Sequence, residues 1–310
     1  MKIVGQSAEL INIEDSIKKI EYIGRVCYGS QNLIKEGSAD KFVGSLVERK
    51  HYSPLEHAHI CFNCDSFTWR ELKSDVEGLE NSFHREYNLK FSSIKGYLVS
   101  GNFRAWLEFL EDYSTCWTFI DLGILESLKK YFSVFGKINL KGSGSARCIE
   151  VSFDKISHNE QLIHRPYTIH AVANRAIQQE FTRHRHFSYT IESTRYIGYD
   201  KEKFGNEIKV IVPDHLASLS IDSLCEFREH MESIEAYYKE LRSQGVSPQN
   251  ARDILPLCLA SDMYITGTLN DWIHFDKLRR VGVTGTPHPQ IKELATMIHH
   301  LIPYNDAENS

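Results

Sequence analysis

The apolar residues of this chain follow a helical spacing in some stretches and alternate with polar ones in others. Helical spacing over residues 13–20 and again over residues 41–50 predicts two amphipathic helices. Pro54 ends the second pattern, because proline has no backbone N–H and restricts the residue before it. Residues 58–63 then alternate between apolar and polar, which predicts a half-buried strand.

The remainder of the chain is predicted to mix long helices with short strands. Residues 66–150 are mostly of helical pattern, and a strand over residues 167–172 is predicted to run into a helix that continues through Arg185. The other predicted elements are a strand over 208–212 and helices over 234–245, after Pro248, over 268–279 and after Pro289. We therefore expect one domain over residues 1–310 with an α+β fold, in which helices flank a central, mostly antiparallel sheet.

Composition narrows the classes of protein that fit this pattern. With 310 residues, of which 42% are hydrophobic and 25% charged, the chain is typical of a soluble globular protein. The net charge of −5 provides no basic field for nucleic acid. Neither a run of about 18 apolar residues nor a signal-peptide pattern is present. We therefore expect a cytoplasmic protein with no nucleic-acid partner and no membrane partner.

The cysteines and histidines do not form a recognisable disulfide or metal pattern. The seven cysteines are scattered, and an odd number in a chain of this length predicts reduced thiols. His57, His59 and Cys61 alternate along the predicted strand, and Cys61 forms a C-x-x-C pair with Cys64. Zinc sites usually need a second ligand pair at a similar spacing, and none is evident, so we expect no metal site.

The most distinctive chemistry lies in residues 183–196, RHRHFSYTIESTRY, which hold three arginines and two histidines. Guanidinium groups stay charged and present paired donors that match phosphate and carboxylate geometry. Several of them on one short segment repel one another unless an anion binds there. One interpretation is a solvated basic cluster that offsets a helix dipole. The other is a site for a phosphorylated heterocyclic molecule.

This segment, an R-H-R triplet followed by seven residues and then S-x-R-Y, resembles the signature of the flavin-dependent thymidylate synthases. Three other segments resemble that family in the same order along the chain: SPLEH at residues 53–57, ARDILPL at 251–257 and WIHFDKLR at 272–279. The resemblance covers residues 40 to 300. Residues 66–150 exceed a minimal member of the family, so we interpret them as a helical insertion.

The resemblance implies a specific reaction. Enzymes of this family methylate C5 of dUMP to give dTMP, with methylenetetrahydrofolate as the carbon donor and NADPH as the source of reducing equivalents. FAD carries the hydride chemistry, while the protein supplies orientation and electrostatics. No catalytic cysteine is needed. The family also implies a homotetramer whose active sites take residues from several subunits.

The resemblance also implies roles for individual residues. The residues expected at the flavin are His57, Arg183, His184, Arg185 and His274. The residues expected at the nucleotide are Glu180, Ser193, Thr194, Arg195, Arg252 and Arg279, with Ser193 to Arg195 at the phosphate. The expected catalytic residues are Arg183, Ser193 and Arg279. For Glu180 an ordinary carboxylate on a helix face is the alternative.

Three positions depart from the family pattern and leave other functions open. Thr268 and Asn270 stand where many members carry asparagine and arginine, and Ile191 replaces a polar residue before the signature serine. One alternative is a flavin-dependent C5-methylase of UMP or of a modified pyrimidine nucleotide. The other is a divergent, non-catalytic homologue that binds nucleotide or RNA. The second alternative predicts a protein without FAD and without turnover.

Overall fold

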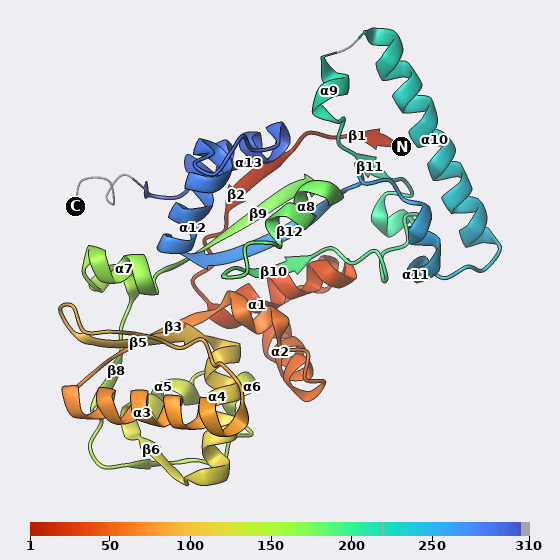
Figure 1. Ribbon diagram of the computed structural model, residues 1–310. Helices are drawn as coiled ribbons and strands as arrows, with labels where there is room; N and C mark the ends of the chain where they lie inside the picture. Colours follow the sequence, from red (N-terminus) through yellow and green to blue (C-terminus); the bar gives the residue numbers. More distant parts are fainter. Residues whose placement is uncertain (219, 305–310) are drawn as a thin grey trace.

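Two four-stranded antiparallel sheets organise the computed structural model, which describes residues 1–218 and 220–304 (Figure 1). The main sheet has the order β10-β12-β9-β2, with strands β2 (Ser7–Leu10), β9 (Pro166–Asn174), β10 (Ser188–Ile191) and β12 (Ala260–Thr268). The second sheet has the order β4-β5-β3-β8, with strands β3 (His59–Cys64), β4 (Lys90–Ser92), β5 (Tyr97–Asn102) and β8 (Cys148–Glu150). The predicted α+β class with an antiparallel central sheet is confirmed.

Helices cover both faces of the main sheet. One face packs against α8 (Arg175–Phe181), α12 (Leu269–Asp276) and α13 (Pro289–His299). Aromatic rings fill this core, and the rings of Phe181 and Phe275 stack with their centroids 4.5 Å apart. The opposite face packs against α1 (Ser16–Gly24), which brings Ile23 onto Tyr264. The alternation of side chains along β9 and β12 therefore gives the sheet one largely apolar face and one face of mixed polarity.

Several predicted elements agree with the structure, but one helix ends earlier than predicted and two strands were not predicted. The predicted helices correspond to α1, to α2 (Ser38–Glu48), to α10 (Ile221–Ser243) and to α13, and the predicted strand after Pro54 is β3. The helix predicted to continue through Arg185 is wrong, because α8 ends at Phe181. The strand β10, which follows Arg185, and the central strand β12 were not predicted. Both strands depend on pairing with distant segments, which local periodicity does not report.

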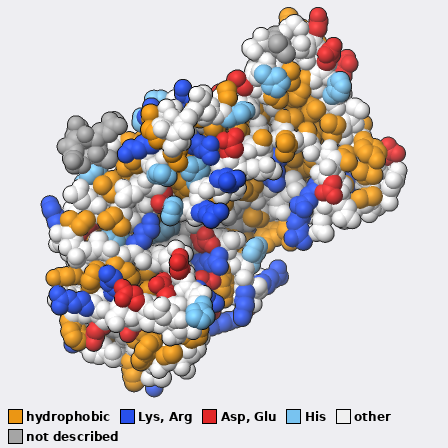
Figure 2. Space-filling view, viewed as in Figure 1, with side chains coloured by type: hydrophobic (Ala, Val, Ile, Leu, Met, Phe, Trp, Pro, Cys, Tyr) orange, Lys and Arg blue, Asp and Glu red, His pale blue; other side chains and the backbone are white. Residues whose placement is uncertain are grey.

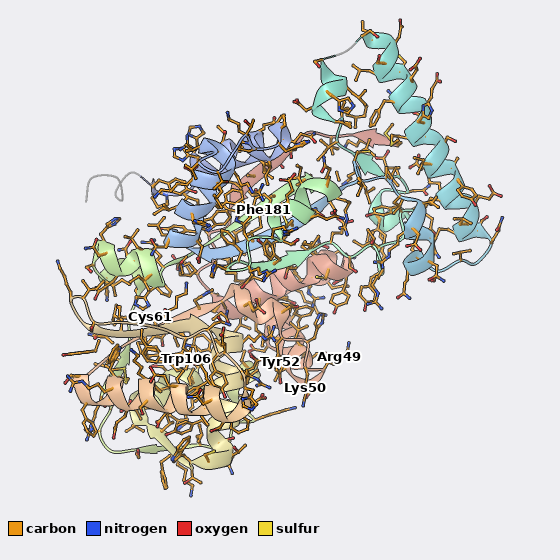
Figure 3. The ribbon with its side chains drawn as sticks, viewed as in Figure 1. Arg49, Lys50, Tyr52, Cys61, Trp106 and Phe181 are labelled. Carbon is orange, nitrogen blue, oxygen red and sulfur yellow. A yellow bond between two sulfur atoms is a disulfide. The ribbon has the colours of Figure 1, made fainter. Side chains whose placement is uncertain are left out.

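The segment 66–150 contains strands as well as helices. Its helices are α3 (Ser66–Phe83), α4 (Phe103–Cys116), α5 (Leu122–Lys129) and α6 (Phe132–Phe135). Besides β4, β5 and β8 it contains the paired strands β6 (Phe119–Asp121) and β7 (Lys141–Ser143). Since β5 and β8 pair with β3 on either side, the segment extends a sheet that begins before it. Together with side chains of α1, α2 and β3 it forms a core around Trp106, separate from the core around Phe181 (Figure 3).

A disulfide joins the two ends of this segment, contrary to the expectation that every cysteine is reduced. Cys64 and Cys148 lie directly opposite each other on β3 and β8, with their Cα atoms 4.0 Å apart. They are 84 residues apart in the chain, so only the strand register reveals the pairing. The other five cysteines are free thiols.

The C-terminal half carries a peripheral unit at the end of the main sheet where β12 begins (Figure 1). It consists of α9 (Asp214–Ala217), α10, α11 (Pro248–Ala251) and the parallel pair β1 (Lys2–Ile3) with β11 (Lys209–Val210). The strand β11 is shorter than the predicted strand over residues 208–212. Glu235 on α10 binds the N-terminal amino group at 2.7 Å and thereby ties the start of the chain to this unit. Of the helices that the structure describes, none is long and apolar enough to span a membrane.

Candidate active site

The Arg183-His184-Arg185 triplet lies on a turn between α8 and β10. Asn174 caps the start of α8 by accepting a hydrogen bond from the backbone of Ile177, which fixes where the helix begins. At the other end, the Tyr189 hydroxyl lies within hydrogen-bonding distance of the carbonyl oxygens of Phe181 and His184. The turn is therefore held by β10, and its side chains project from a rigid support.

Arg279 is locked against this turn by two hydrogen bonds. Its Nε donates to Nε2 of His184 at 2.9 Å, and its Nη1 donates to Oε2 of Glu180 at 3.0 Å. Arg279 lies in a π-helical turn, Lys277–Val281, that follows α12, and such turns often occur at functional sites. The structure thus brings Arg279 onto two other predicted site residues, His184 and Glu180, which lie 95 and 99 residues earlier in the chain.

His184 is held in its neutral form. Burial and the charge of Arg279 lower the pKa of His184 to about 4. A neutral imidazole accepts a hydrogen bond at one ring nitrogen only, so acceptance at Nε2 places the proton on Nδ1. His184 therefore acts as the acceptor that orients the guanidinium of Arg279.

Arg183 and Arg185, by contrast, keep their guanidinium groups available. Both side chains are exposed, and within residues 1–218 and 220–304 neither guanidinium makes a hydrogen bond or an ion pair. Figure 2 shows Lys, Arg and His side chains gathered across the middle of the visible face, between the main sheet and the segment 66–150. Two unpaired guanidiniums beside a locked one form a site for an anionic ligand.

Two adjoining cavities open at this turn. The first, here called the signature cavity, has a volume of about 620 Å³ and is lined by Arg183, His184, Asn270, His274, Leu278 and Arg279. The second, here called the insert cavity, has a volume of about 450 Å³ and lies between the turn and the segment 66–150. The residues that line both are Arg185, His186, Phe187 and Asp271. Each volume is in the range of small-molecule sites, and the shared wall makes the two a single extended cleft.

His57, predicted at the flavin, lies inside the protein instead. It is 0% exposed, and its Nδ1 and Nε2 lie 2.7 and 2.9 Å from the hydroxyl oxygens of Thr266 and Thr190. Burial and the charge of Lys19 lower its pKa to about 3. His57 thus connects the 3-10 turn Ser53–His57 to the main sheet as a neutral side chain and lines neither cavity.

His59 is a site residue that the sequence alone did not reveal. It lines the insert cavity, and its Nδ1 is a buried polar atom without a hydrogen-bond partner in the structure. Buried polar atoms are normally satisfied, so an unpartnered one at a cavity wall marks a place for a ligand group. The available signal was the alternation His57-x-His59 along the predicted strand.

The predicted phosphate residues form a second cluster at the far end of β10. Arg195 donates from Nε to Gln249 at 3.0 Å, and Arg252 approaches the Thr194 hydroxyl at 3.5 Å. Ser193 begins the turn there, since its carbonyl accepts hydrogen bonds from two later backbone amides. None of these residues lines the signature or the insert cavity. One strand of four residues, about 10 Å long, therefore separates the two groups of predicted site residues.

The departure at Ile191 has a structural explanation. Ile191 packs against the apolar core of the main sheet, and the polar side chain at this point is its neighbour Glu192. Glu192 accepts a hydrogen bond from the Tyr199 hydroxyl at 3.0 Å. Burial and the charge of Asp262 raise the pKa of Glu192 to about 7. The strand thus presents a carboxyl group on the face opposite to the triplet.

No metal site was expected, and in the described part of the chain no group of three or more His, Cys, Asp or Glu side chains is placed to hold a metal ion. Cys64 of the C-x-x-C pair is taken up by the disulfide.

The sequence model of one protein family, described as "Thymidylate synthase complementing protein", matches residues 9–73 and 136–303. The chain belongs to this family. Membership confirms the resemblance that the R-H-R signature indicated. The unmatched residues 74–135 lie within the segment 66–150, where α3 ends and where α4, α5 and α6 lie.

Individual relatives are similar over less than half of this chain. A "Probable flavin-dependent thymidylate synthase" of Paramecium bursaria Chlorella virus 1 is 27% identical over 133 residues, or 39% of this chain and 60% of that protein. The "Flavin-dependent thymidylate synthase" of Pyrococcus furiosus is 28% identical over 144 residues, or 41% of this chain and 58% of that protein. The chain therefore matches about 60% of the length of these relatives.

Among solved structures, the chain is similar to a UMP/dUMP methylase, PolB, from Streptomyces cacaoi bound with 5-Br dUMP. The TM-score is 0.42 at 14% identity, over 97% of this chain and 91% of that chain.

The residues of the cleft fit a flavin dinucleotide. The unpaired Arg183 and Arg185 match phosphate oxygens, and the unpartnered Nδ1 of His59 matches a polar ring or sugar atom. Phe187 forms an apolar wall shared by the two cavities. This donor set suits a ligand that is anionic at one point and aromatic at another.

Proposed function

We propose that this protein methylates C5 of dUMP to give dTMP in an FAD-dependent reaction, with methylenetetrahydrofolate as the carbon donor and NADPH as the reductant. The observation that carries the proposal is the arrangement of Arg279, fixed by His184 and Glu180, beside the unpaired Arg183 and Arg185 in one cleft. Family membership supports it, and the R-H-R triplet and Arg279, which belong to segments that resemble the family, line the cleft.

The flavin would be held by Arg183, His184, Arg185 and His274, which line the signature cavity. When bound, it supplies the hydride chemistry of the reaction. His57 does not touch the cleft, so we assign it a positioning role: it fixes the turn Ser53–His57 against β10 and β12.

The part played by the arginines follows from charge. C5 of uracil is a weak nucleophile, and it becomes a stronger one when the ring loses a proton and carries negative charge on its carbonyl oxygens. A guanidinium that is already oriented stabilises this charge without rearranging, which is why the contacts of Arg279 to His184 and Glu180 matter. Arg183 adds a second positive group on the same wall. In this proposal both are catalytic residues.

The nucleotide phosphate is assigned to Ser193, Thr194, Arg195 and Arg252, the cluster at the far end of β10. Because β10 separates this cluster from Arg183 and Arg279, we propose that a second copy of the chain completes the site in a homotetramer. Ser193 then contributes to catalysis by holding the substrate from the neighbouring subunit. Static light scattering of the purified protein tests this, and a monomer at all concentrations would contradict it.

We also propose that the enzyme acts on small nucleotide and folate substrates in the cytoplasm, without a nucleic-acid or membrane partner. The rival functions differ in substrate or in cofactor. A C5-methylase of UMP would bind UMP at least as tightly as dUMP. A non-catalytic nucleotide- or RNA-binding homologue would bind no FAD.

The experiment is a visible absorption spectrum of the protein with added FAD, followed by titration with dUMP and with UMP. A flavin band that shifts with dUMP supports the proposal, and a shift with UMP alone supports the rival substrate. Arg183→Ala should abolish turnover and leave the far-UV circular dichroism unchanged. Full activity in that variant, or a wild-type protein that binds neither FAD nor dUMP, refutes the proposal.

A further inference from the structure

The segment 66–150 forms one wall of the insert cavity. Two ion pairs fasten it to the rest of the protein around that cavity. Arg104 on α4 binds Glu56 at 2.7 Å, and Nζ of Lys90 on β4 lies 3.7 Å from Oδ2 of Asp271 on α12. All four of these residues line the cavity. The segment is thus built into the cleft rather than attached to a remote surface.

The two basic residues differ in how many of their donors are engaged. Arg104 is clamped between Glu56 and Glu108, which bind its Nη1 and Nε. Lys90 makes one hydrogen bond within the described residues, from Nζ to the Thr268 hydroxyl at 3.3 Å. An ammonium group has three donors. Lys90, whose side chain is 40% exposed, therefore keeps donors available for a ligand, whereas Arg104 acts as a strut.

The carboxylate beside Lys90 is already engaged in the protein. Oδ2 of Asp271 accepts hydrogen bonds from the backbone N–H and the hydroxyl of Thr268, at 2.8 and 2.6 Å, in a capping box at the start of α12. Its charge is further offset by Lys90. The carboxylate nearest to the ammonium is therefore already engaged where an anionic group would approach.

The start of α12 has no cation of its own. Its first turn and cap present Thr268, Asn270 and Asp271 to the cleft, none of which is positively charged. At this point the two cavities meet, since Asp271 lines both. The positive charge at the junction comes from Arg185 on the signature turn and from Lys90 on the segment 66–150.

We infer that the insert cavity holds the adenosine-diphosphate half of FAD and that Lys90 binds its diphosphate, so the segment 66–150 selects FAD over the shorter flavin FMN. A diphosphate carries two negative charges and accepts charge-assisted hydrogen bonds from ammonium groups. The inference rests on the proposed function, because it assumes that the signature cavity takes the flavin ring. The inference adds that residues of the segment, which the family model leaves unmatched over 74–135, form part of the cofactor site.

The test measures dissociation constants of FAD and of FMN by flavin fluorescence, on protein freed of bound flavin. Lys90→Ala should weaken FAD binding roughly tenfold and leave FMN binding within about twofold, whereas Lys90→Arg should restore FAD binding. Lys137→Ala is the matched control, because Lys137 also joins the segment to the rest of the protein, at 3.3 Å from Glu48, but lies outside the cleft.

The outcomes separate the inference from the proposed function. Three results would overturn the inference: an unchanged FAD affinity in Lys90→Ala, an equal loss of FMN affinity in that variant, or an equal effect of Lys137→Ala. In each of these cases flavin binding by the wild-type protein would still support the proposed function. A wild-type protein that binds neither flavin overturns both.

Discussion

Removing the guanidinium of Arg279 should raise the pKa of His184. In the structure, Arg279 donates from Nε to Nε2 of His184 at 2.9 Å, a contact that exists only while the imidazole is neutral. Protonation of His184 would break that hydrogen bond and place two positive charges side by side. Arg279→Ala removes both effects and leaves the burial of His184.

The size of the shift follows from the bond that is lost. A hydrogen bond that involves a charged group contributes about 1.5–3 kcal/mol. About 1.4 kcal/mol corresponds to one pKa unit, so the pKa of His184 should rise by roughly one to two units. It starts from about 4 and should remain below its ordinary value of 6.5, because burial is the larger cause of the depression and persists in the variant.

The assay is an NMR titration of the His184 ring, assigned by the resonance that disappears in His184→Asn. Arg280→Ala is the matched control: Arg280 is the next residue and binds Asp276 at 2.6 and 2.8 Å. It should leave the His184 titration unchanged. A His184 pKa that stays near 4 in Arg279→Ala would refute the reasoning. In turnover, the same variant should lose roughly two to three orders of magnitude in kcat, as expected for one oriented donor.

Two further predictions concern stability. Burial lowers the pKa values of His57 and His164 to about 3 and about 4, so between these values and pH 6.5 the unfolded chain binds protons that the folded chain does not bind. The contribution of these residues to the free energy of unfolding should therefore be fully present above pH 6.5 and should decrease as the pH falls towards 4. Urea unfolding at several pH values checks this, and a flat profile would contradict it. Cys148→Ser opens a loop of 84 residues and should lower the free energy of unfolding by about 4–5 kcal/mol on the chain-entropy model. Cys225→Ser, at an exposed free thiol, is the control, and a reductant without effect on wild-type stability would show that the bond does not form.

The candidate site shows which features can be predicted from neighbouring residues in the sequence and which cannot. Arg183, His184 and Arg185 are adjacent in the chain, so the sequence alone predicts that they can bind an anion together. The contact between Arg279 and His184 spans 95 residues, and only the motif resemblance suggested that the two belong together. The structure adds the geometry, with the imidazole as acceptor and the guanidinium as donor.

His57 and His59 illustrate the opposite case. They lie two residues apart in the sequence, and the family resemblance implied a flavin contact for His57 alone. In the structure His57 has both ring nitrogens bound to threonine hydroxyls, whereas Nδ1 of His59 lacks a partner at the cavity wall. Which side of a packed layer each ring reaches depends on the neighbouring strands β10 and β12, and β12 was not predicted at all.

The sequence by itself determined the amphipathic helices, the α+β class and the basic signature, because these depend on residue type and on spacing over a few turns of chain. Tertiary structure decided the rest: the pairing of β12 with β9 and β10, the disulfide across 84 residues, and the approach of Lys90 to Thr268 across 178 residues. These contacts form between segments that are distant in the chain, and the periodic pattern of residues within a segment does not reveal its distant partner. Their partners are set by how the sheets and helices pack, and no pattern within either segment encodes that packing.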